Sequence, residues 1–347
     1  MFRGSYTAIV TPMKGEGGRA IDFRALERLV EFQVASGVTG LLPMGTTGES
    51  PTLNWEEHSE VIVKVKGFSR DRCTVIAGTG SNCTEETIVN TRHVAKYKIE
   101  AILLVDPYYN GPSSVEIRKE YVSPIAQAFP DIQVIPYVIP GRTGTQLLPE
   151  DLAILHQEHR NVSAVKEATG SLDNMRRTRL CCGRDMQILS GDDDLTFQMM
   201  TDPAIGAWGV ISVASNVAPA AVQQMTEAVL AGNTDEGRAL HEALKPLFNI
   251  VTVKTQEASP WGDRLCKARN PLPIKTLMHI LGMPVGPCRQ PLGRMTRKGV
   301  QTVLGAAREV WQKNPEILRP IAHAFEVDIE QRLNDPAVLD GLFYDDV

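Results

Sequence analysis

The residue best suited to covalent chemistry in this sequence is a lysine at the end of an apolar run. Lys166 follows Val162, Ala164 and Val165 and precedes a stretch that is typical of a helix start. A lysine amine attacks a carbonyl carbon only in its neutral form, so its ordinary pKa of ~10.4 must be lowered by a desolvating pocket or a nearby cation. The segment therefore indicates a Schiff-base nucleophile. A solvent-exposed lysine at a strand end is the alternative interpretation.

Hydroxyl, glycine and charged residues follow other apolar runs at the same relative place. They are Thr11, Gly45–Ser50, Gly78–Gly80, Asp106–Asn110, Tyr137–Gly144, Gly191–Asp193 and Ile211–Ser212. Histidine is absent from these segments, which argues against a serine–histidine triad and against a cluster of metal ligands. We therefore expect no bound metal.

The elements that must position these residues alternate between short apolar strands and longer amphipathic helices. We predict eight strands, at 6–10, 40–43, 74–77, 101–105, 133–138, 162–166, 187–190 and 209–213, and eight helices that begin near Asp22, Asn54, Thr84, Ser114, Pro149, Ser171, Asp193 and Ala218. Thr84 is expected to cap its helix. Eight such pairs predict an α/β fold, the closed (β/α)8 TIM barrel, because the GxGxxG turn of an open dinucleotide-binding sheet is missing. In a barrel, the residues that follow the strands share one mouth.

The remaining sequence predicts helices appended to the barrel. Amphipathic patterns predict helices at 235–248, 274–281 and 296–312, and one amphipathic piece in the tail at 317–333. We therefore divide the chain into a catalytic barrel (1–232), a C-terminal helical region (233–313) and an extension (314–347). The sequence does not indicate what the extension does.

Composition narrows the class of protein. A chain of 347 residues with 43% hydrophobic residues can bury a full core, and its apolar runs are much shorter than the ~20 residues that span a bilayer. The net charge of -5 and the scattered basic residues argue against a nucleic-acid partner. Six cysteines without paired spacing fit a reducing compartment. We expect a cytoplasmic protein with small-molecule partners and no membrane association.

Six segments at the predicted strand ends together resemble the signatures of the dihydrodipicolinate synthase family, also called the 4-hydroxy-tetrahydrodipicolinate synthases. They are Gly45–Ser50, Pro107–Asn110, Gly141–Gly144, Val165–Gly170, Ser190–Asp193 and Gly209–Val213, and the match runs in order from Met1 to about Leu292. The resemblance implies a lyase of the class I aldolase type, in the N-acetylneuraminate lyase superfamily. Such an enzyme condenses pyruvate with L-aspartate 4-semialdehyde in lysine (diaminopimelate) biosynthesis and uses no cofactor.

The resemblance also implies catalytic roles. Lys166 matches the lysine that forms a covalent imine with pyruvate, and Tyr137 matches the tyrosine that moves protons beside it. Thr47 and Tyr109 match the residues that link this tyrosine to solvent. In the family, the equivalent of Tyr109 reaches in from a neighbouring subunit, so the resemblance implies a homodimer or homotetramer.

Further positions match binding residues of the family. Thr46 and Thr47 match the turn that holds the pyruvate carboxylate, and Arg142 matches the residue that grips the carboxylate of the aldehyde. Two other positions match residues that line the pocket, namely Gly191 and Ile211. A candidate lysine-regulatory site matches at Ser50, His58, Asn82, Glu86 and Tyr108, with the departure that Trp55 stands where some lysine-sensitive members carry histidine.

Two alternatives stay open at the level of the sequence. One is another pyruvate-dependent aldolase or lyase of the same superfamily, since these enzymes share the glycine-threonine turn, the tyrosine and the lysine. The other is a non-catalytic barrel that binds small molecules. The unexplained extension suggests the second alternative, and so does Val138, which stands where the family frequently carries asparagine.

Overall fold

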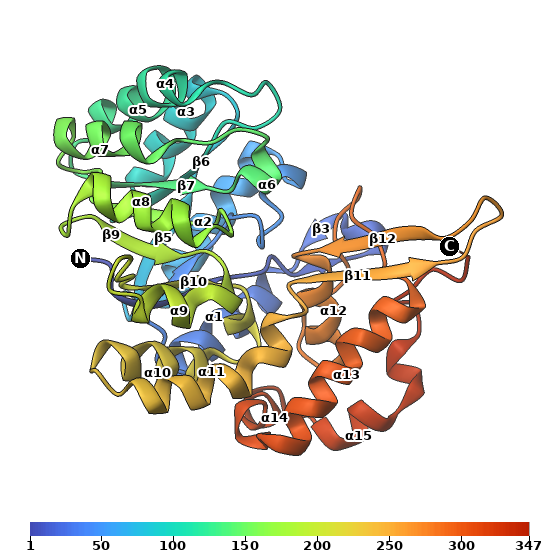
Figure 1. Cartoon of the computed structure of the whole chain (residues 1–347). Coiled ribbons are helices and arrows are strands. Elements are labelled where there is room, and N and C mark those ends of the chain that lie inside the picture. Colours follow the sequence, from blue (N-terminus) through green and yellow to red (C-terminus); the bar gives the residue numbers. More distant parts are fainter. Residues whose placement is uncertain (347) are drawn as a thin grey trace.

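The structure, a computed structural model, describes residues 1–346 and contains a closed barrel of eight parallel strands (Figure 1). The strands are β1 (Gly4–Ala8), β4 (Gly40–Leu42), β5 (Thr74–Gly78), β6 (Ala101–Val105), β7 (Gln133–Val138), β8 (Ala164–Glu167), β9 (Gln187–Ser190) and β10 (Gly209–Ser212). Strand β1 pairs with both β4 and β10, which closes the ring. The predicted (β/α)8 barrel is therefore confirmed.

Helices surround the barrel and connect its strands. They are α1 (Phe23–Ala35), α2 (Trp55–Ser69), α3 (Thr84–Ala95), α4 (Ser114–Glu116), α5 (Ser123–Ala128), α7 (Pro149–Glu158), α8 (Leu172–Cys182), α9 (Thr196–Thr201) and α10 (Pro219–Leu230). The predicted cap at Thr84 is wrong, because Cys83 occupies the cap position of α3. The Thr84 hydroxyl instead donates to the Glu120 carbonyl at 2.8 Å, so it ties α3 to its neighbour.

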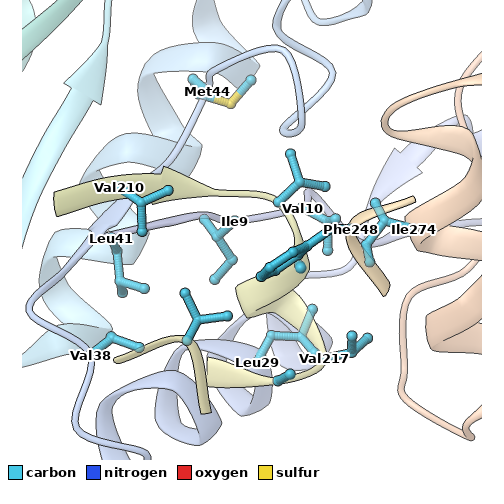
Figure 2. Close-up of a cluster of buried hydrophobic side chains, with 14 of the residues drawn as sticks. Ile9, Val10, Leu29, Val38, Leu41, Met44, Val210, Val217, Phe248 and Ile274 are labelled. Carbon is cyan, nitrogen blue, oxygen red and sulfur yellow. The ribbon is translucent and has the colours of Figure 1, made fainter. Parts of the chain in front are cut away.

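Within residues 1–346, five α-helices follow the barrel, and side chains from this part of the chain pack against it. The helices are α11 (Thr234–Phe248), α12 (Leu272–Ile280), α13 (Arg297–Lys313), α14 (Arg319–Phe325) and α15 (Ile329–Asn334). Figure 2 shows Phe248 and Ile274 from this part beside Val10 and Val217 of the barrel, and all four side chains are buried. One buried hydrophobic cluster thus joins the barrel to the helices after it. The domain boundaries at 232 and 313 remain a prediction.

Two short hairpins lie outside the sequence prediction. Strands β2 (Met13–Lys14) and β3 (Ala20–Ile21) form one, and β11 (Thr252–Glu257) and β12 (Arg264–Arg269) form the other. The second hairpin projects from the body of the protein on the same side as α6 (Pro140–Thr143), the turn after β7 (Figure 1). Its strands carry few apolar residues, so they lack the alternating hydrophobic pattern that identifies a half-buried strand.

The C-terminal extension packs on the helices. The single amphipathic piece predicted for 317–333 is wrong in detail, because Glu326, with a φ of 56°, separates α14 from α15. Phe325 meets Phe32 of α1 edge-on, with ring centroids 5.3 Å apart. Arg332 donates to the carbonyls of Ile280 and His279 at 2.9 and 2.8 Å, which satisfies the end of α12.

The structure also bears on the expectations about cysteines and membranes. All six cysteines are free thiols. Across residues 1–346, no helix combines the length and the apolar character that crossing a bilayer requires.

Candidate active site

Lys166 and Tyr137 face each other at the carboxyl ends of adjacent strands. They are register partners in the β7–β8 pair, and the Lys166 Nζ lies 4.1 Å from the centroid of the Tyr137 ring. Both side chains are 5% exposed. The order of the barrel strands therefore turns two residues 29 positions apart in sequence into neighbours.

Burial changes the acid–base behaviour of Lys166. Desolvation lowers the pKa of Lys166 to about 8; the carboxylates of Asp193 and Asp192 oppose this shift, and the Arg142 charge supports it. At pH 7 roughly a tenth of the Lys166 side chains would be neutral, against fewer than one in a thousand for an ordinary lysine. The site thus makes the free amine available near neutral pH.

Tyr137 is held in its protonated form. Burial raises the pKa of the Tyr137 phenol to about 12, although the Arg142 charge and the Thr46 side chain favour the phenolate. A phenol that stays protonated beside the amine can donate a proton to an oxygen that is leaving the reacting carbon.

Gly191 makes room for the lysine. A Cβ at this position would lie 2.7 Å from the Cβ of Ala168 and 3.0 Å from the Cε of Lys166. The Gly191 N–H donates to the Glu167 carbonyl at 2.7 Å, which holds the chain close to β8. Ile211, on the inner surface of β10, is buried in the same cluster as Tyr137. A side chain at position 191 would therefore clash with Ala168 and crowd the side chain of Lys166.

A cavity of about 330 Å³ opens at this end of the barrel. Its lining includes Thr46, Tyr108, Tyr137 and Arg142. Its size and mixed polar and apolar lining suit a small organic ligand. Burial lowers the pKa of Arg142, with a neighbouring charge from Arg269 in the same direction. The Arg142 guanidinium thus lines the cavity and is also accessible from solvent, where small anions would reach it.

Asn270 connects two parts of the site, and the sequence alone did not reveal it. Its main-chain carbonyl accepts a hydrogen bond from the Arg142 Nη2 at 3.0 Å, and its side-chain amide donates to the Thr47 hydroxyl at 2.9 Å. The Asn270 Oδ1 is buried and has no partner among the described residues. The Asn-Pro pair after β12 could have marked a turn, but nothing in it indicated a contact with the barrel mouth.

A buried ion pair supports the turn that carries Thr46 and Thr47. The Lys275 Nζ lies 2.6 Å from the Glu49 Oε1, and both side chains are almost fully buried. The same Nζ donates to the carbonyls of Thr11 and Pro287. This contact fixes the end of the turn to α12.

Tyr109 is placed differently from the other catalytic candidates. Its side chain is 91% exposed, and its φ of 82° is unusual for a residue with a side chain. Thr47, in contrast, is buried and bonded to Asn270. The single chain therefore brings together Lys166, Tyr137, Thr46, Thr47 and Arg142 but leaves Tyr109 in the open.

The candidate regulatory residues form two small groups. The Ser50 hydroxyl lies 3.2 Å from the His58 Nε2, and burial lowers the pKa of His58 to about 4. The Ser81 hydroxyl bridges the carboxylate of Glu86, at 2.8 Å, and the side chain of Asn82, at 3.5 Å. Burial raises the pKa of the half-buried Tyr108, and the charge of Glu86 acts in the same direction. His58 also packs on Trp55, with ring centroids 5.0 Å apart.

The chain is similar to known proteins over most of its length. The model of the dihydrodipicolinate synthetase family matches residues 1–309. The chain belongs to this family. It is 40% identical to the 4-hydroxy-tetrahydrodipicolinate synthase of Geotalea daltonii over 310 residues, which cover 89% of this chain and 99% of that relative.

Solved structures of the family share the fold. The dihydrodipicolinate synthase of Acinetobacter baumannii, solved with pyruvate, has a TM-score of 0.80 at 32% identity and covers 89% of this chain and 99% of its own. The DHDPS of Cyanidioschyzon merolae, solved with lysine bound, has a TM-score of 0.80 at 35% identity and covers 89% and 98%. The family match ends at residue 309, so α14, α15 and the rest of the extension lie beyond it.

Among residues 1–346, no group of three or more His, Cys, Asp and Glu side chains is arranged to hold a metal ion. The reactive groups that the site presents are the Lys166 amine, the Tyr137 phenol and the Arg142 guanidinium.

Proposed function

We propose that this protein condenses pyruvate with L-aspartate 4-semialdehyde, the reaction of 4-hydroxy-tetrahydrodipicolinate synthases. The observation that supports this most directly is the buried Lys166 amine against the Tyr137 ring, in a chain that belongs to the dihydrodipicolinate synthetase family. The neighbouring Arg142, which lines the cavity, supplies a cation for a substrate carboxylate. The protein needs no cofactor under this proposal.

The first half of the reaction makes a nucleophile from pyruvate. The neutral Lys166 amine attacks the ketone carbon, and the resulting carbinolamine loses water to give an iminium. Tyr137 donates the proton that the departing hydroxyl requires. The iminium withdraws electrons from the adjacent methyl group, which loses a proton and leaves an enamine.

The second half forms the carbon–carbon bond. The enamine carbon attacks the aldehyde carbon of the semialdehyde, whose oxygen takes a proton as the bond forms. The substrate's own amino group then attacks the iminium carbon, closes the ring and releases the Lys166 amine. Arg142 holds the carboxylate of the semialdehyde, and the Thr46–Thr47 turn holds that of pyruvate.

The exposed Tyr109 supports an oligomeric active site. A large aromatic side chain that is 91% exposed in an unusual backbone conformation is costly for a single chain. Under the proposal, Tyr109 enters the site of a neighbouring subunit in a homodimer or homotetramer. Sedimentation of the native protein and of Tyr109→Phe tests the assembly, which should be the same for both. Steady-state kinetics test the role in the site, because the variant should lose turnover.

We also propose that lysine, if it regulates the protein, binds beside Ser50, His58, Asn82, Glu86 and Tyr108. The support is the shared environment of Ser50 with His58 and of Glu86 with Tyr108. Calorimetric titration with lysine tests this, with Glu86→Gln as the variant that should weaken binding. Absence of heat for the native protein would remove the proposal.

The decisive experiment is reduction of the imine. Incubation with pyruvate and borohydride should add one reduced pyruvate to the native chain, and peptide mass analysis should find it on Lys166. A folded protein that gains no adduct would instead be the non-catalytic binding barrel.

Substrate assignment needs a second measurement. The Arg142→Ala variant should still form the adduct but should show a lower kcat/KM for the semialdehyde, by about 10- to 100-fold if a charged hydrogen bond worth about 1.5–3 kcal/mol is lost. Equal loss of imine formation would contradict the role given to Arg142. Turnover of another aldehyde at a higher kcat/KM would favour the related aldolases or lyases.

A further inference from the structure

The projecting hairpin β11–β12 has two different faces. In an antiparallel pair, residues directly opposite each other point to the same side of the ladder. The register of the two strands therefore places Val253, Thr255 and Glu257 on one face, and Lys254 opposite Lys267 on the other. The inner face packs on the helical region: the Thr255 hydroxyl lies 3.1 Å from that of Thr296, and Glu257 pairs with Lys298.

The outer face is basic. It carries Lys254, Lys267 and Arg269, and the other three side chains on this face are uncharged. All three basic residues are exposed. Among the salt bridges of residues 1–346, none includes a member of this trio. We call Lys254, Lys267 and Arg269 the basic face.

The basic face carries an electrostatic cost. Lys254 and Lys267 are direct register partners, and like charges opposite each other destabilise a strand pair. The positive charges of Arg269, Lys254 and Arg142 all lower the pKa of Lys267, and no carboxylate opposes them. A local concentration of positive charge thus persists in a chain whose net charge is -5.

The basic face adjoins the candidate active site. The Arg269 Nη1 donates to the Gly141 carbonyl at 3.2 Å, next to Arg142 in the turn after β7. The residue after Arg269 is Asn270, whose carbonyl holds the Arg142 guanidinium. Figure 1 shows the hairpin and α6 on the same side of the barrel. The surface charge is therefore continuous with the cation inside the pocket.

We propose that the basic face is an anion-collecting surface that raises the concentration of pyruvate at the mouth of the barrel. This inference rests on the proposed function. Pyruvate carries one net negative charge at pH 7, whereas the semialdehyde carries a carboxylate and an ammonium group and is neutral overall. A positive surface beside the entrance attracts the first substrate and leaves the second almost unaffected.

The test compares charge variants by their Michaelis constants. Lys254→Gln/Lys267→Gln removes two charges and keeps the contact of Arg269 with Gly141, and Lys254→Glu/Lys267→Glu reverses them. We expect the KM for pyruvate at low ionic strength to rise about threefold for the first variant and about tenfold for the second. The KM for the semialdehyde and kcat should change by less than a factor of two. At ~0.5 M salt the differences should vanish.

A matched control lies at the other end of the barrel. Lys96 and Lys98 are exposed after α3, and Lys96→Gln/Lys98→Gln changes the net charge by the same amount. This control should leave the KM for pyruvate at its native value. Equal effects of both pairs would show that only net charge matters and would overturn the proposal.

Two other outcomes are equally clear. Exposed lysines on a strand can also prevent edge-to-edge pairing. If the hairpin variants aggregate or change their oligomeric state while the KM for pyruvate and its salt dependence stay native, the basic face protects the edge and the proposal is wrong. Borohydride trapping distinguishes failure of this inference from failure of the proposed function. A normal Lys166 adduct together with an unchanged KM for pyruvate in the hairpin variants contradicts only this inference. Absence of any adduct in the native protein contradicts the proposed function.

Discussion

Two buried lysines in this protein have opposite surroundings. Lys275, at the junction of the barrel with α12, donates to the Glu49 carboxylate and to two main-chain carbonyls. Lys166, inside the barrel mouth, faces the Tyr137 ring instead of a carboxylate. Burial with a full set of acceptors keeps an ammonium group in place, and burial without them favours the neutral amine. The same residue type therefore serves structure in one place and is suited to chemistry in the other.

Substitution of each lysine in turn should have the largest effects and tests whether Lys166 serves chemistry and Lys275 serves stability. Lys166→Ala should abolish the pyruvate adduct and leave the unfolding transition close to native, because no ion pair is lost. Lys275→Met should lower the free energy of unfolding by about 3–5 kcal/mol, since the Glu49 carboxyl group would be left buried without its ion-pair partner. Mass analysis after borohydride and urea denaturation measure the two effects.

A second variant keeps this prediction testable if Lys275→Met does not fold. Glu49→Gln/Lys275→Met removes both charges and should recover most of the lost stability. Loss of the adduct in Lys166→Ala together with a large loss of stability would mean that Lys166 is structural as well. Retention of the adduct would assign the imine to another amine.

Tyr137 provides a test of the chemical role of Lys166, because its phenol is the proposed proton donor beside the amine. Tyr137→Phe keeps the ring against Lys166 and deletes the proton donor. We expect kcat to fall by about 10²- to 10⁴-fold, the usual contribution of a positioned acid or base. Steady-state kinetics measure the change, and an unaltered thermal transition serves as the control. A kcat within threefold of native would exclude Tyr137 as the donor.

The pH dependence distinguishes the environment of Lys166 from that of an exposed lysine. The rate of imine formation should rise with pH through a midpoint near 8 and level off above it, because only the neutral amine reacts. Between about pH 8 and the ordinary lysine pKa of 10.5, the folded protein binds fewer protons at Lys166 than the unfolded chain does, so Lys166 should make stability rise with pH in that window. Trapping of the imine with borohydride at timed intervals and at several pH values measures how the rate of imine formation depends on pH.

Asp192 provides the variant that tests the cause of this midpoint. Its carboxylate favours the charged form of Lys166, so Asp192→Asn should move the midpoint to a lower pH. Burial raises the pKa of Asp192 itself to about 6, so its influence should be complete only above that pH. A midpoint that stays in place would show that the Asp192 carboxylate does not influence the pKa of Lys166.

The smallest expected effect concerns the extension. Arg332→Ala removes two hydrogen bonds to the last carbonyls of α12 and should lower the free energy of unfolding by about 1–3 kcal/mol. Arg319→Ala, at an exposed position in α14, is the matched control and should stay within ~0.5 kcal/mol of native. Imine formation should be native in both. Equal stability of the two variants would mean that the contact with α12 contributes little.

Much of the barrel was predictable because its strands are apolar runs between amphipathic segments. That pattern placed Lys166 and Tyr137 at strand ends, and the barrel topology brought them together. Asn270 could not be found in this way, since it lies 104 positions after Lys166 and acts through a main-chain carbonyl. The basic hairpin was missed because its outer face has no hydrophobic period. The break at Glu326 was missed because a glutamate in a left-handed conformation leaves no signal in the sequence.

The hydrogen bond that holds Arg142 depends on the backbone at position 270 and not on the side chain there. The acceptor is the peptide oxygen of residue 270, so every amino acid at that position would present it, provided the backbone keeps its course. A substitution at position 270 would thus remove the side-chain hydrogen bond to Thr47 and keep the main-chain hydrogen bond to Arg142. Insertions or deletions between the hairpin and α12 are the changes that would release it.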